Sequence, residues 1–306
     1  MPKQGPYADK LFIHHLAFNE LYRRMLFNYC IPALIDDYKR LVAAGVEVEW
    51  IVHTDSMVEK REYPGVNIQY ALIKDTGAWY LNTMSVIRES QRQNAYIAMI
   101  APDNIFGRSS LYNAYMLARH KDTTIAIAHP RVLAEEFMKK YAPGRTYGNR
   151  ELVTLSVEGK IRHPALQYAF DDLDESFTNQ GISIRRMGNH VYGVVHTLPS
   201  GIVFHFSSDD VAFLSGTSWG EIDRGLNIKL FGEKRIKLVG CSDVCFFIEL
   251  TRPTHNFSHL YPNLRNNDKH EDPRQNIFNN MIVFWMGEQR GKDKAALGSG
   301  TQEPGR

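Results

Sequence analysis

Residues 95–104 read AYIAMIAPDN, and the fold class follows from this stretch. The run Ala95–Ile100 is apolar and has the length of a buried strand, and Pro102 ends it in the polar turn Asp103-Asn104. Continuous apolar runs of this kind are typical of strands in parallel sheets that helices cover on both faces. The stretch therefore predicts a central strand whose carboxyl end carries polar side chains.

Strand and helix signals alternate around this stretch. The expected strands cover residues 11–16, 46–53, 67–73 and 123–128, and the expected helices cover 18–44, 79–94, 109–120 and 130–141. Strands separated by helical segments predict a parallel sheet with right-handed crossovers. Pro32 lies inside the first helix and should kink or divide it. Residues up to about 143 are thus expected to form a Rossmann-like α/β sheet, mainly parallel, with helices on both faces.

The composition changes beyond about residue 143, where Gly, Pro, Asn and His become frequent. Strand-like pieces at 191–195, 201–206 and 236–250 are joined by long loops. We expect a first half, 1–142, with an α+β second half, 143–290, packed on it without a clean linker. The last stretch, 291–306, is rich in Gly, Lys, Gln and Pro and predicts a disordered tail.

Charge and composition disfavour several classes of protein. The formal net charge is +2, and no dense cluster of Lys and Arg predicts a nucleic-acid partner. No window reaches the roughly 18 apolar residues that span a bilayer, and Met1–Lys10 lacks the apolar core of a signal peptide. The chain has three cysteines, Cys30, Cys241 and Cys245, and no fourth cysteine that would complete a zinc site. Reduced thiols and a cytoplasmic location are expected.

Two acidic turns follow expected strands of the first half and contain Asp55 and Asp103. In open parallel sheets, ligands bind outside the carboxyl ends of the strands. A carboxylate there can hold a divalent cation or a ribose hydroxyl, or it can only cap a helix or shape a turn. Two such turns at strand ends favour a binding site.

The chain has no Walker loop, no G-x-G-x-x-G after the first strand and no G-x-S-x-G elbow, which disfavours kinases, dehydrogenases, methyltransferases and hydrolases.

Acidic residues of the second half are candidates for proton transfer. Asp243 is a lone acid in an apolar segment, where a charge is costly unless it is paired or functional, although a strand-end turn explains it equally well. Asp223 is a further candidate. Asp209 and Asp210 are explained more simply as the start of a helix. Histidines near strand ends, His129 among them, are expected to be structural.

Several short phrases together resemble the bacterial GT-A-like glycosyltransferases. They are YCIPAL at 29–34, the strand end VHTD at 52–55, the strand end APDN at 101–104 with SSL at 109–111, GT at 216–217, EID at 221–223, and CSDV at 241–244 leading into Glu249-Leu250. The resemblance covers about residues 11–250. It implies a GT-A-like enzyme of polysaccharide biosynthesis, which transfers a sugar from a nucleoside diphosphate donor to a hydroxyl of a glycan or another acceptor.

The resemblance also implies roles for individual residues. Donor binding falls to Asp55, Asp103, Asn104, Arg108 and Arg131, catalysis to Asp243 and Asp223, and binding of Mn²⁺ or Mg²⁺ to Asp103 and His259. The family's Asp-x-Asp signature is incomplete here, because the turn reads Asp103-Asn104-Ile105. Two interpretations remain open: a metal-dependent enzyme with one carboxylate fewer, or a metal-independent enzyme in which arginines offset the diphosphate charge.

Two other classes share these sequence features. A protein that binds a nucleotide sugar or a glycan without turnover would keep the fold and tolerate the incomplete Asp-x-Asp. A Rossmann-like nucleotidyltransferase would keep the carboxylates at the strand ends but would release pyrophosphate. The sequence does not separate these alternatives from a glycosyltransferase.

Overall fold

The structure is a computed structural model. It describes residues 9–75, 77–127, 129, 131–157, 182–187, 190–195, 200–216, 226, 229–230, 232–239, 245, 247–251 and 282–288. Asp223, Asp243, His259 and the segment 291–306 lie outside the described residues.

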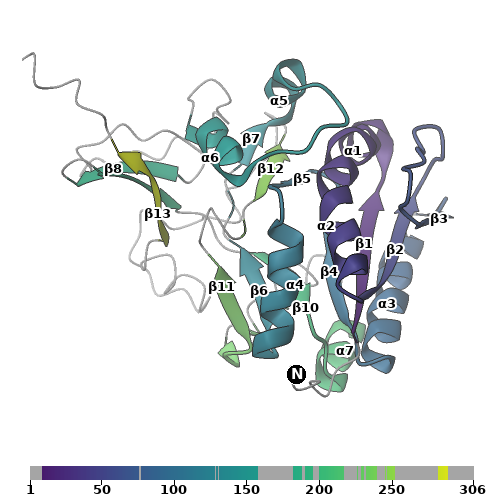
Figure 1. Cartoon of the computed structure of the whole chain (residues 1–306). Helices are drawn as coiled ribbons and strands as arrows, with labels where there is room; N and C mark the ends of the chain where they lie inside the picture. Colours follow the sequence, from purple (N-terminus) through teal and green to yellow (C-terminus); the bar gives the residue numbers. More distant parts are fainter. Residues whose placement is uncertain are drawn as a thin grey trace, which may run out of the picture.

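A seven-stranded sheet forms the centre of the molecule (Figure 1). Its strands, in spatial order, are β11 (Ile236–Val239), β6 (Thr124–Ile127), β10 (Ser200–Phe204), β4 (Tyr96–Met99), β1 (Lys10–Ala17), β2 (Glu47–Thr54) and β3 (Ile68–Leu72). All neighbouring pairs are parallel except those of β10, which runs antiparallel to β4 and to β6. The mainly parallel sheet expected from the sequence is confirmed.

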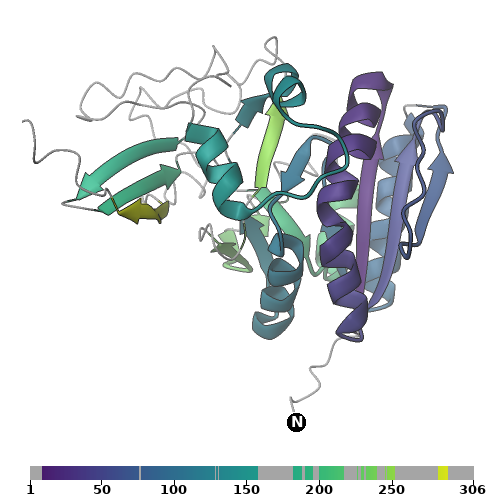
Figure 2. The ribbon, with the colours of Figure 1, turned by 45° about the horizontal axis from the view of Figure 1, so that its top comes forward.

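Helices cover both faces of this sheet (Figures 1 and 2). One face packs against α1 (Asn19–Met25), the π-helical turn η1 (Leu26–Cys30), α2 (Ile31–Ala43) and α4 (Ser110–Lys121), and the other against α3 (Gly77–Arg92) and α7 (Ser208–Ser215). In β1, Leu11 and Ile13 pack toward the first group of helices, and Phe12 packs toward the second. This alternation is the period-two pattern of a strand with two buried faces. The chain is an α/β protein consistent with a Rossmann-like fold.

The sheet includes strands from both halves of the chain. The strands β10 and β11 come from beyond residue 143, and β10 inserts between β4 and β6. The sequence predicts a strand at each place but not their membership of this sheet. Pairing between strands far apart in the chain depends on tertiary packing, which a local apolar pattern does not specify.

The first helical segment is divided next to Pro32, as expected. The π-helical turn η1 separates α1 from α2, and Pro32 lies in the first turn of α2. Proline has no N–H to donate to the carbonyl four residues earlier, which here is that of Asn28. The backbone N–H of Gly144 donates to this carbonyl instead, at 2.7 Å. Gly144 has φ +84°, a conformation that glycine adopts without strain.

Helix α4 begins at a carboxylate supplied by another helix. Ser109 directly precedes α4, but its side chain makes no capping hydrogen bond, and its φ is +68°. The carboxylate of Asp37, in α2, accepts from the backbone N–H groups of Ser109, Leu111 and Tyr112 at 2.8, 2.8 and 3.2 Å. Burial raises the pKa of Asp37 to about 6, and the three N–H groups oppose part of this rise. Asp37 thereby fixes α2 against the start of α4.

Two smaller sheets accompany the large one. The first contains β5 (Asn104–Phe106), β12 (Phe247–Thr251) and β7 (Arg131–Leu133), and the second contains β13 (Ile282–Glu288), β9 (His190–Val195) and β8 (Ile182–Met187). Helices α5 (Ala134–Lys140) and α6 (Asn149–Val157) lie near β7 and β12 (Figure 1). The expected helix 130–141 was wrong at its start, because 131–133 form β7 and pair with β12. The expected strand 236–250 is two strands in different sheets.

Candidate functional site

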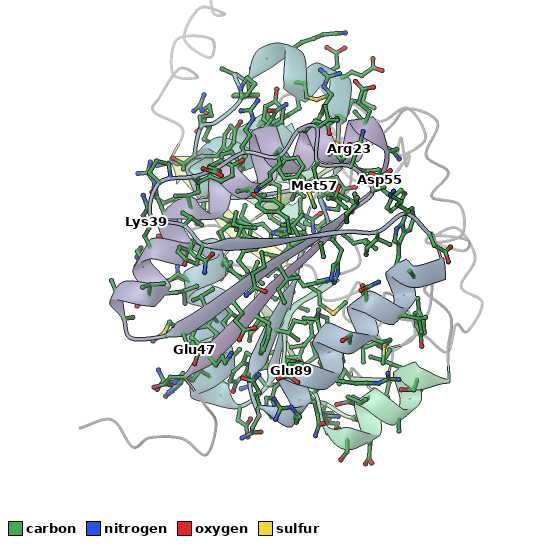
Figure 3. All side chains as sticks on the ribbon, turned by 90° about the vertical axis from the view of Figure 1, so that its right-hand side faces the viewer. Arg23, Lys39, Glu47, Asp55, Met57 and Glu89 are labelled. Carbon is green, nitrogen blue, oxygen red and sulfur yellow. The ribbon has the colours of Figure 1, made fainter. Side chains whose placement is uncertain are left out.

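The strand order reverses between β1 and β4. From β1 the chain adds β2 and β3 on one side and then returns to place β4 on the other side. Ligands of open α/β sheets bind outside the carboxyl ends of the strands at such a point. We call this region, with the turns after β1, β2 and β4 and the adjoining sheet β5-β12-β7, the carboxyl edge. Figure 3 shows Asp55 and Arg23 at this end of β2, away from Glu47 at its start.

Asp55 joins the ends of β1 and β2. Its carboxylate accepts from the backbone N–H of Asn19 at 2.9 Å and from the guanidinium of Arg23 at 2.5 Å. Arg23 also donates to Glu59 at 2.7 Å, so that one cation lies between two carboxylates. The side chain of Asp55 is 30% exposed, which leaves part of it open to a ligand. Asp55 thus holds the start of α1 in place at the carboxyl edge.

An aromatic group lies beside this acidic turn. Phe18, the residue before α1, stacks on Trp79 of α3 with ring centroids 4.3 Å apart, and Tyr22 packs against Phe18 at 5.3 Å. All three side chains are partly exposed. The indole N–H of Trp79 is buried and has no hydrogen-bond acceptor among the described residues. Partly exposed aromatic side chains are suited to contact a planar ligand.

Asp103 stands in a turn that the backbone closes. The N–H of Asn104 donates to the carbonyl of Ala101 at 3.1 Å, with Pro102 in the position where its fixed φ suits a tight turn. The carbonyl of Asp103 accepts from the N–H of Leu250 at 2.8 Å, which fixes β12 beside the turn. Closure of this turn therefore does not use the Asp103 carboxylate.

The small sheet places Glu249 between two of the expected donor-binding residues. In the ladders of this sheet, Glu249 of β12 is the register partner of Asn104 in β5 and of Arg131 in β7. Directly opposed residues of an antiparallel pair project from the same face, with Cβ atoms about 5 Å apart. Asn104 and Glu249 therefore share a face at the carboxyl edge. The carboxylate of Glu249 also accepts from Nε2 of His129 at 2.8 Å.

The histidines of β1 and β2 are structural, as expected. His14 and His53 are buried, and their rings join through a 3.0 Å contact between Nε2 and Nδ1. Burial lowers the pKa of both, and the pKa of His14 falls well below its ordinary value. His15 contacts the carbonyl of Ile100 at 2.9 Å through Nδ1, and burial lowers the pKa of His15 to about 3. These rings are neutral at physiological pH.

The remaining expected site residues divide into three groups. Arg108 is exposed and follows β5, and its backbone N–H donates to the carbonyl of Tyr147 at 2.7 Å. Arg131 starts β7, so that its backbone lies at the carboxyl edge. Asp223, Asp243 and His259 lie outside the described residues. Among the residues that the structure describes, no group of three His, Cys, Asp or Glu side chains is arranged to hold a metal ion.

Sequence reasoning missed the aromatic group, the contact of Arg23 with Asp55, and the pair of Glu249 with His129. The sequence does mark Glu249 of the Glu249–His129 pair, because Glu249 is the only charged residue in the strand Phe247–Thr251. The argument that selected Asp243 from its apolar surroundings applies equally to Glu249. The other two contacts join residues from different elements, and no local pattern marks them.

No protein-family model matches the chain, and no curated protein matches it either. Within the described part of the chain, no helix combines the length and the apolar character needed to cross a membrane. The fold and the carboxyl edge define an α/β protein with a mostly parallel, helix-flanked sheet and a polar and aromatic region at its strand switch point.

Proposed function

We propose that this protein is a glycosyltransferase of GT-A-like fold, which transfers a sugar from a nucleoside diphosphate donor to a hydroxyl of a glycan or another acceptor. One observation carries the proposal. The polar and aromatic groups described above gather outside the carboxyl ends of β1, β2 and β4, where the strand order reverses. This is where a nucleotide binds in sheets of this kind.

The parts of the donor correspond to different groups of the carboxyl edge. The base is proposed to lie against Phe18 and Trp79, whose side chains are partly exposed, with Asp55 nearby to accept from a ribose hydroxyl or a base N–H. The diphosphate and sugar are proposed to lie toward Asp103 and Asn104. These turns are two strand spacings apart, about 10 Å. An extended donor can bridge such a distance.

A divalent cation at the carboxyl edge would bind to oxygen atoms of neighbouring residues and of the donor. Asp103 and Asn104 supply oxygen atoms, which Mg²⁺ and Mn²⁺ prefer, and the described residues supply no third ligand. Mg²⁺ commonly binds through one or two carboxylates together with substrate phosphates. We propose that a bound cation would be shared between Asp103, the diphosphate and His259, and would offset the charge of the leaving diphosphate. Arg108 and Arg131 are the proposed cations if no metal takes part.

Transfer also needs a group that accepts the proton of the acceptor hydroxyl. Asp243 and Asp223 are the candidates expected from the sequence. A cytoplasmic location is part of the proposal, and the buried thiol of Cys30, which forms no disulfide, supports it, because reduced cysteines persist in a reducing compartment.

A thermal-shift screen of nucleoside diphosphates with and without Mn²⁺ tests the proposal. A ligand at about 100 times its Kd stabilises the folded state by about 2.7 kcal/mol, which for a chain of this size raises the melting temperature by about 5 °C. We expect such a rise with at least one nucleoside diphosphate and no rise with the matching nucleoside. No rise with any of them would contradict donor binding.

The nature of the released product then separates the alternatives. A glycosyltransferase releases a nucleoside diphosphate from a nucleotide sugar, and a nucleotidyltransferase releases pyrophosphate. A protein that only binds would show the thermal shift and release neither.

A further inference from the structure

We propose that Glu249 is the catalytic base of the transfer and that His129 holds it in position; this inference rests on the proposed function. The sequence directed attention to Asp243 and Asp223 for this role. The geometry of the small sheet points instead to a carboxylate that has a buried partner, a fixed backbone and access to the carboxyl edge.

The position of Glu249 places it next to the expected diphosphate and sugar. Its register partner in β5 is Asn104, and the following residue, Leu250, binds the carbonyl of Asp103 through its N–H at 2.8 Å. The backbone of Glu249 is therefore about one strand spacing, roughly 5 Å, from Asn104 in the turn that is proposed to hold the reacting end of the donor. It stands on a paired strand, and paired strands position reacting groups better than loops do.

Exposure decides which member of the pair can meet a substrate. The side chain of Glu249 is 17% exposed, whereas that of His129 is 2% exposed. A hydroxyl can reach the carboxylate but not the imidazole. Glu249 is thus the residue that contacts the acceptor, and His129 is the residue that positions Glu249.

His129 is held so that it can act as this support. Its ring stacks on Phe247 with centroids 4.3 Å apart, and Phe247 in turn stacks on Phe106 at 4.9 Å. A carboxylate only accepts hydrogen bonds, so that Nε2 of His129 carries the hydrogen in the 2.8 Å contact with Oε2 of Glu249. The stacked rings fix the direction of this N–H. Glu249 is therefore held in one orientation before the acceptor arrives.

The chemical step is a single displacement. Glu249 takes the proton as the O–H bond of the acceptor breaks, and the acceptor oxygen forms a new bond to the anomeric carbon of the sugar. The bond from that carbon to the phosphate oxygen breaks, and its electron pair leaves with the nucleoside diphosphate. Water in place of the acceptor gives hydrolysis through the same step, which provides an assay when the acceptor is unknown.

Release of nucleoside diphosphate from a panel of UDP-, GDP- and dTDP-linked hexoses, with water as acceptor, tests the role of Glu249. Loss of a general base lowers the rate by at least about a hundredfold. We expect Glu249→Gln to lower kcat by this factor and to leave the melting temperature and the thermal shift with nucleoside diphosphate unchanged. We also expect it to abolish the fall in rate at acidic pH, which in the wild type reports protonation of the base.

Two variants of His129 test its positioning role. His129→Phe keeps a ring on Phe247 but removes the donor to Glu249, and we expect kcat to fall without a change in KM for the donor. His129→Gln retains an N–H donor, so that we expect it to recover part of the loss. Equal activity of both variants would show that the hydrogen bond to Glu249 has no part in catalysis.

The outcomes separate this inference from the proposed function. A donor that binds and is hydrolysed, with Glu249→Gln within about threefold of the wild type, overturns the role of Glu249 and leaves the transferase intact. The same holds if only Asp243→Asn or Asp223→Asn abolishes hydrolysis. A wild-type protein that neither binds a nucleoside diphosphate nor hydrolyses any donor overturns both.

Discussion

Asp210→Asn is expected to lower the free energy of unfolding by about 3 kcal/mol, because removal of one member of a buried ion pair typically costs 3–5 kcal/mol. The lower end of this range applies, since Arg235, one of the partners of Asp210, is 35% exposed and can turn to water. Chemical denaturation of the purified protein measures the change, with an unchanged slope against denaturant as the sign that the folded state is otherwise intact.

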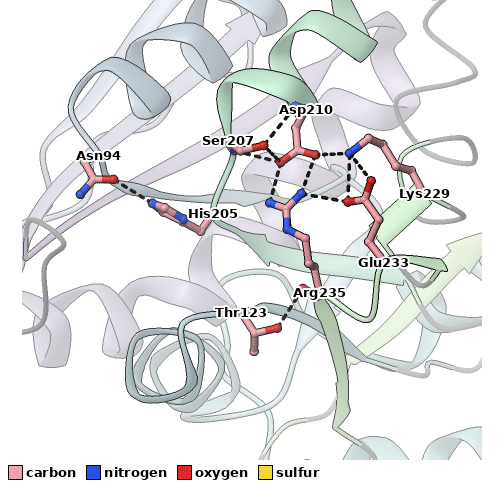
Figure 4. Close-up of polar contacts among 8 residues, drawn as sticks. All are labelled: Asn94, Thr123, His205, Ser207, Asp210, Lys229, Glu233 and Arg235. Carbon is pink, nitrogen blue, oxygen red and sulfur yellow. Dashed lines mark hydrogen bonds and ion pairs between the residues drawn. The ribbon is translucent and has the colours of Figure 1, made fainter.

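The contacts of Asp210 explain the size of this effect (Figure 4). Its buried carboxylate accepts from the guanidinium of Arg235 at 2.9 and 2.7 Å and from the ammonium of Lys229 at 2.8 Å. It also completes a capping box with Ser207 at the start of α7. The backbone carbonyl of Arg235 accepts from Thr123 at 2.8 Å. One side chain thus connects α7 to the segments that lead into β6 and β11.

A surface carboxylate in the same cluster is the matched control. Glu233 contacts the same Lys229 and Arg235, but its side chain is 42% exposed. Exposed ion pairs contribute about 0–1 kcal/mol, so that Glu233→Gln is expected to change stability by less than 1 kcal/mol. An equal loss in both variants would show that burial of Asp210 is not the cause. Activity per folded molecule should be unchanged, because the cluster lies at the amino ends of β6 and β11, away from the carboxyl edge.

The contribution of Asp210 should depend on pH. Burial by itself would raise the pKa of this carboxyl, but the hydrogen bonds from Arg235, Lys229 and Ser207 outweigh burial and leave the pKa well below its ordinary value of 3.8. A carboxyl with a depressed pKa stabilises the folded state above its unfolded pKa and loses this effect as the pH falls. The difference between wild type and Asp210→Asn should therefore be full at pH 7 and shrink below about pH 4.

Asp103→Asn is expected to lower turnover of a nucleotide sugar by at least about a hundredfold, or about 2.7 kcal/mol of transition-state stabilisation. Asparagine keeps the shape of the side chain and removes its charge. The turn at this position is closed by backbone atoms of Ala101 and Asn104, so that the variant should fold normally. Measured kcat/KM for the donor, with and without Mn²⁺, gives the effect.

Asp36→Asn is the control for this substitution. Asp36 is an exposed acid of α2, and its replacement should leave both turnover and stability unchanged. Near-normal turnover of Asp103→Asn with unchanged stability would remove this carboxylate from the site, and Asp243 would be the next residue to test. A loss of turnover that no longer responds to Mn²⁺ would assign the carboxylate to the metal.

The sequence predicted the features that local patterns determine. The apolar run at Ala95–Ile100 and its neighbours specified the strands that the first half contributes to the large sheet, and Pro32 specified the division of the first helix, because proline lacks an N–H wherever it occurs. The start of α4 could not be predicted in this way. Its cap is Asp37, which is distant in the chain and is placed there by packing of α2.

The positions of the candidate site residues were predictable at the level of strand ends, whereas their contacts were not. A polar residue after an apolar strand lies at the carboxyl edge whatever the details of packing, which is why Asp55, Asp103 and Asn104 were placed there. The register of β12 against β5 was not readable, because the two strands are far apart in the chain and a slip of one residue moves every side chain to the other face. Glu249 could be placed only from the structure.

A crystal structure with the nucleoside diphosphate that gives the largest thermal shift tests the central claim most directly. We expect the base beside Phe18 and Trp79 and the diphosphate at the turn that contains Asp103 and Asn104. A nucleotide bound elsewhere, such as in the cavity of ≈ 350 Å³ lined by Lys60, Tyr63 and Tyr70, would contradict the assignment of the donor site to the carboxyl edge.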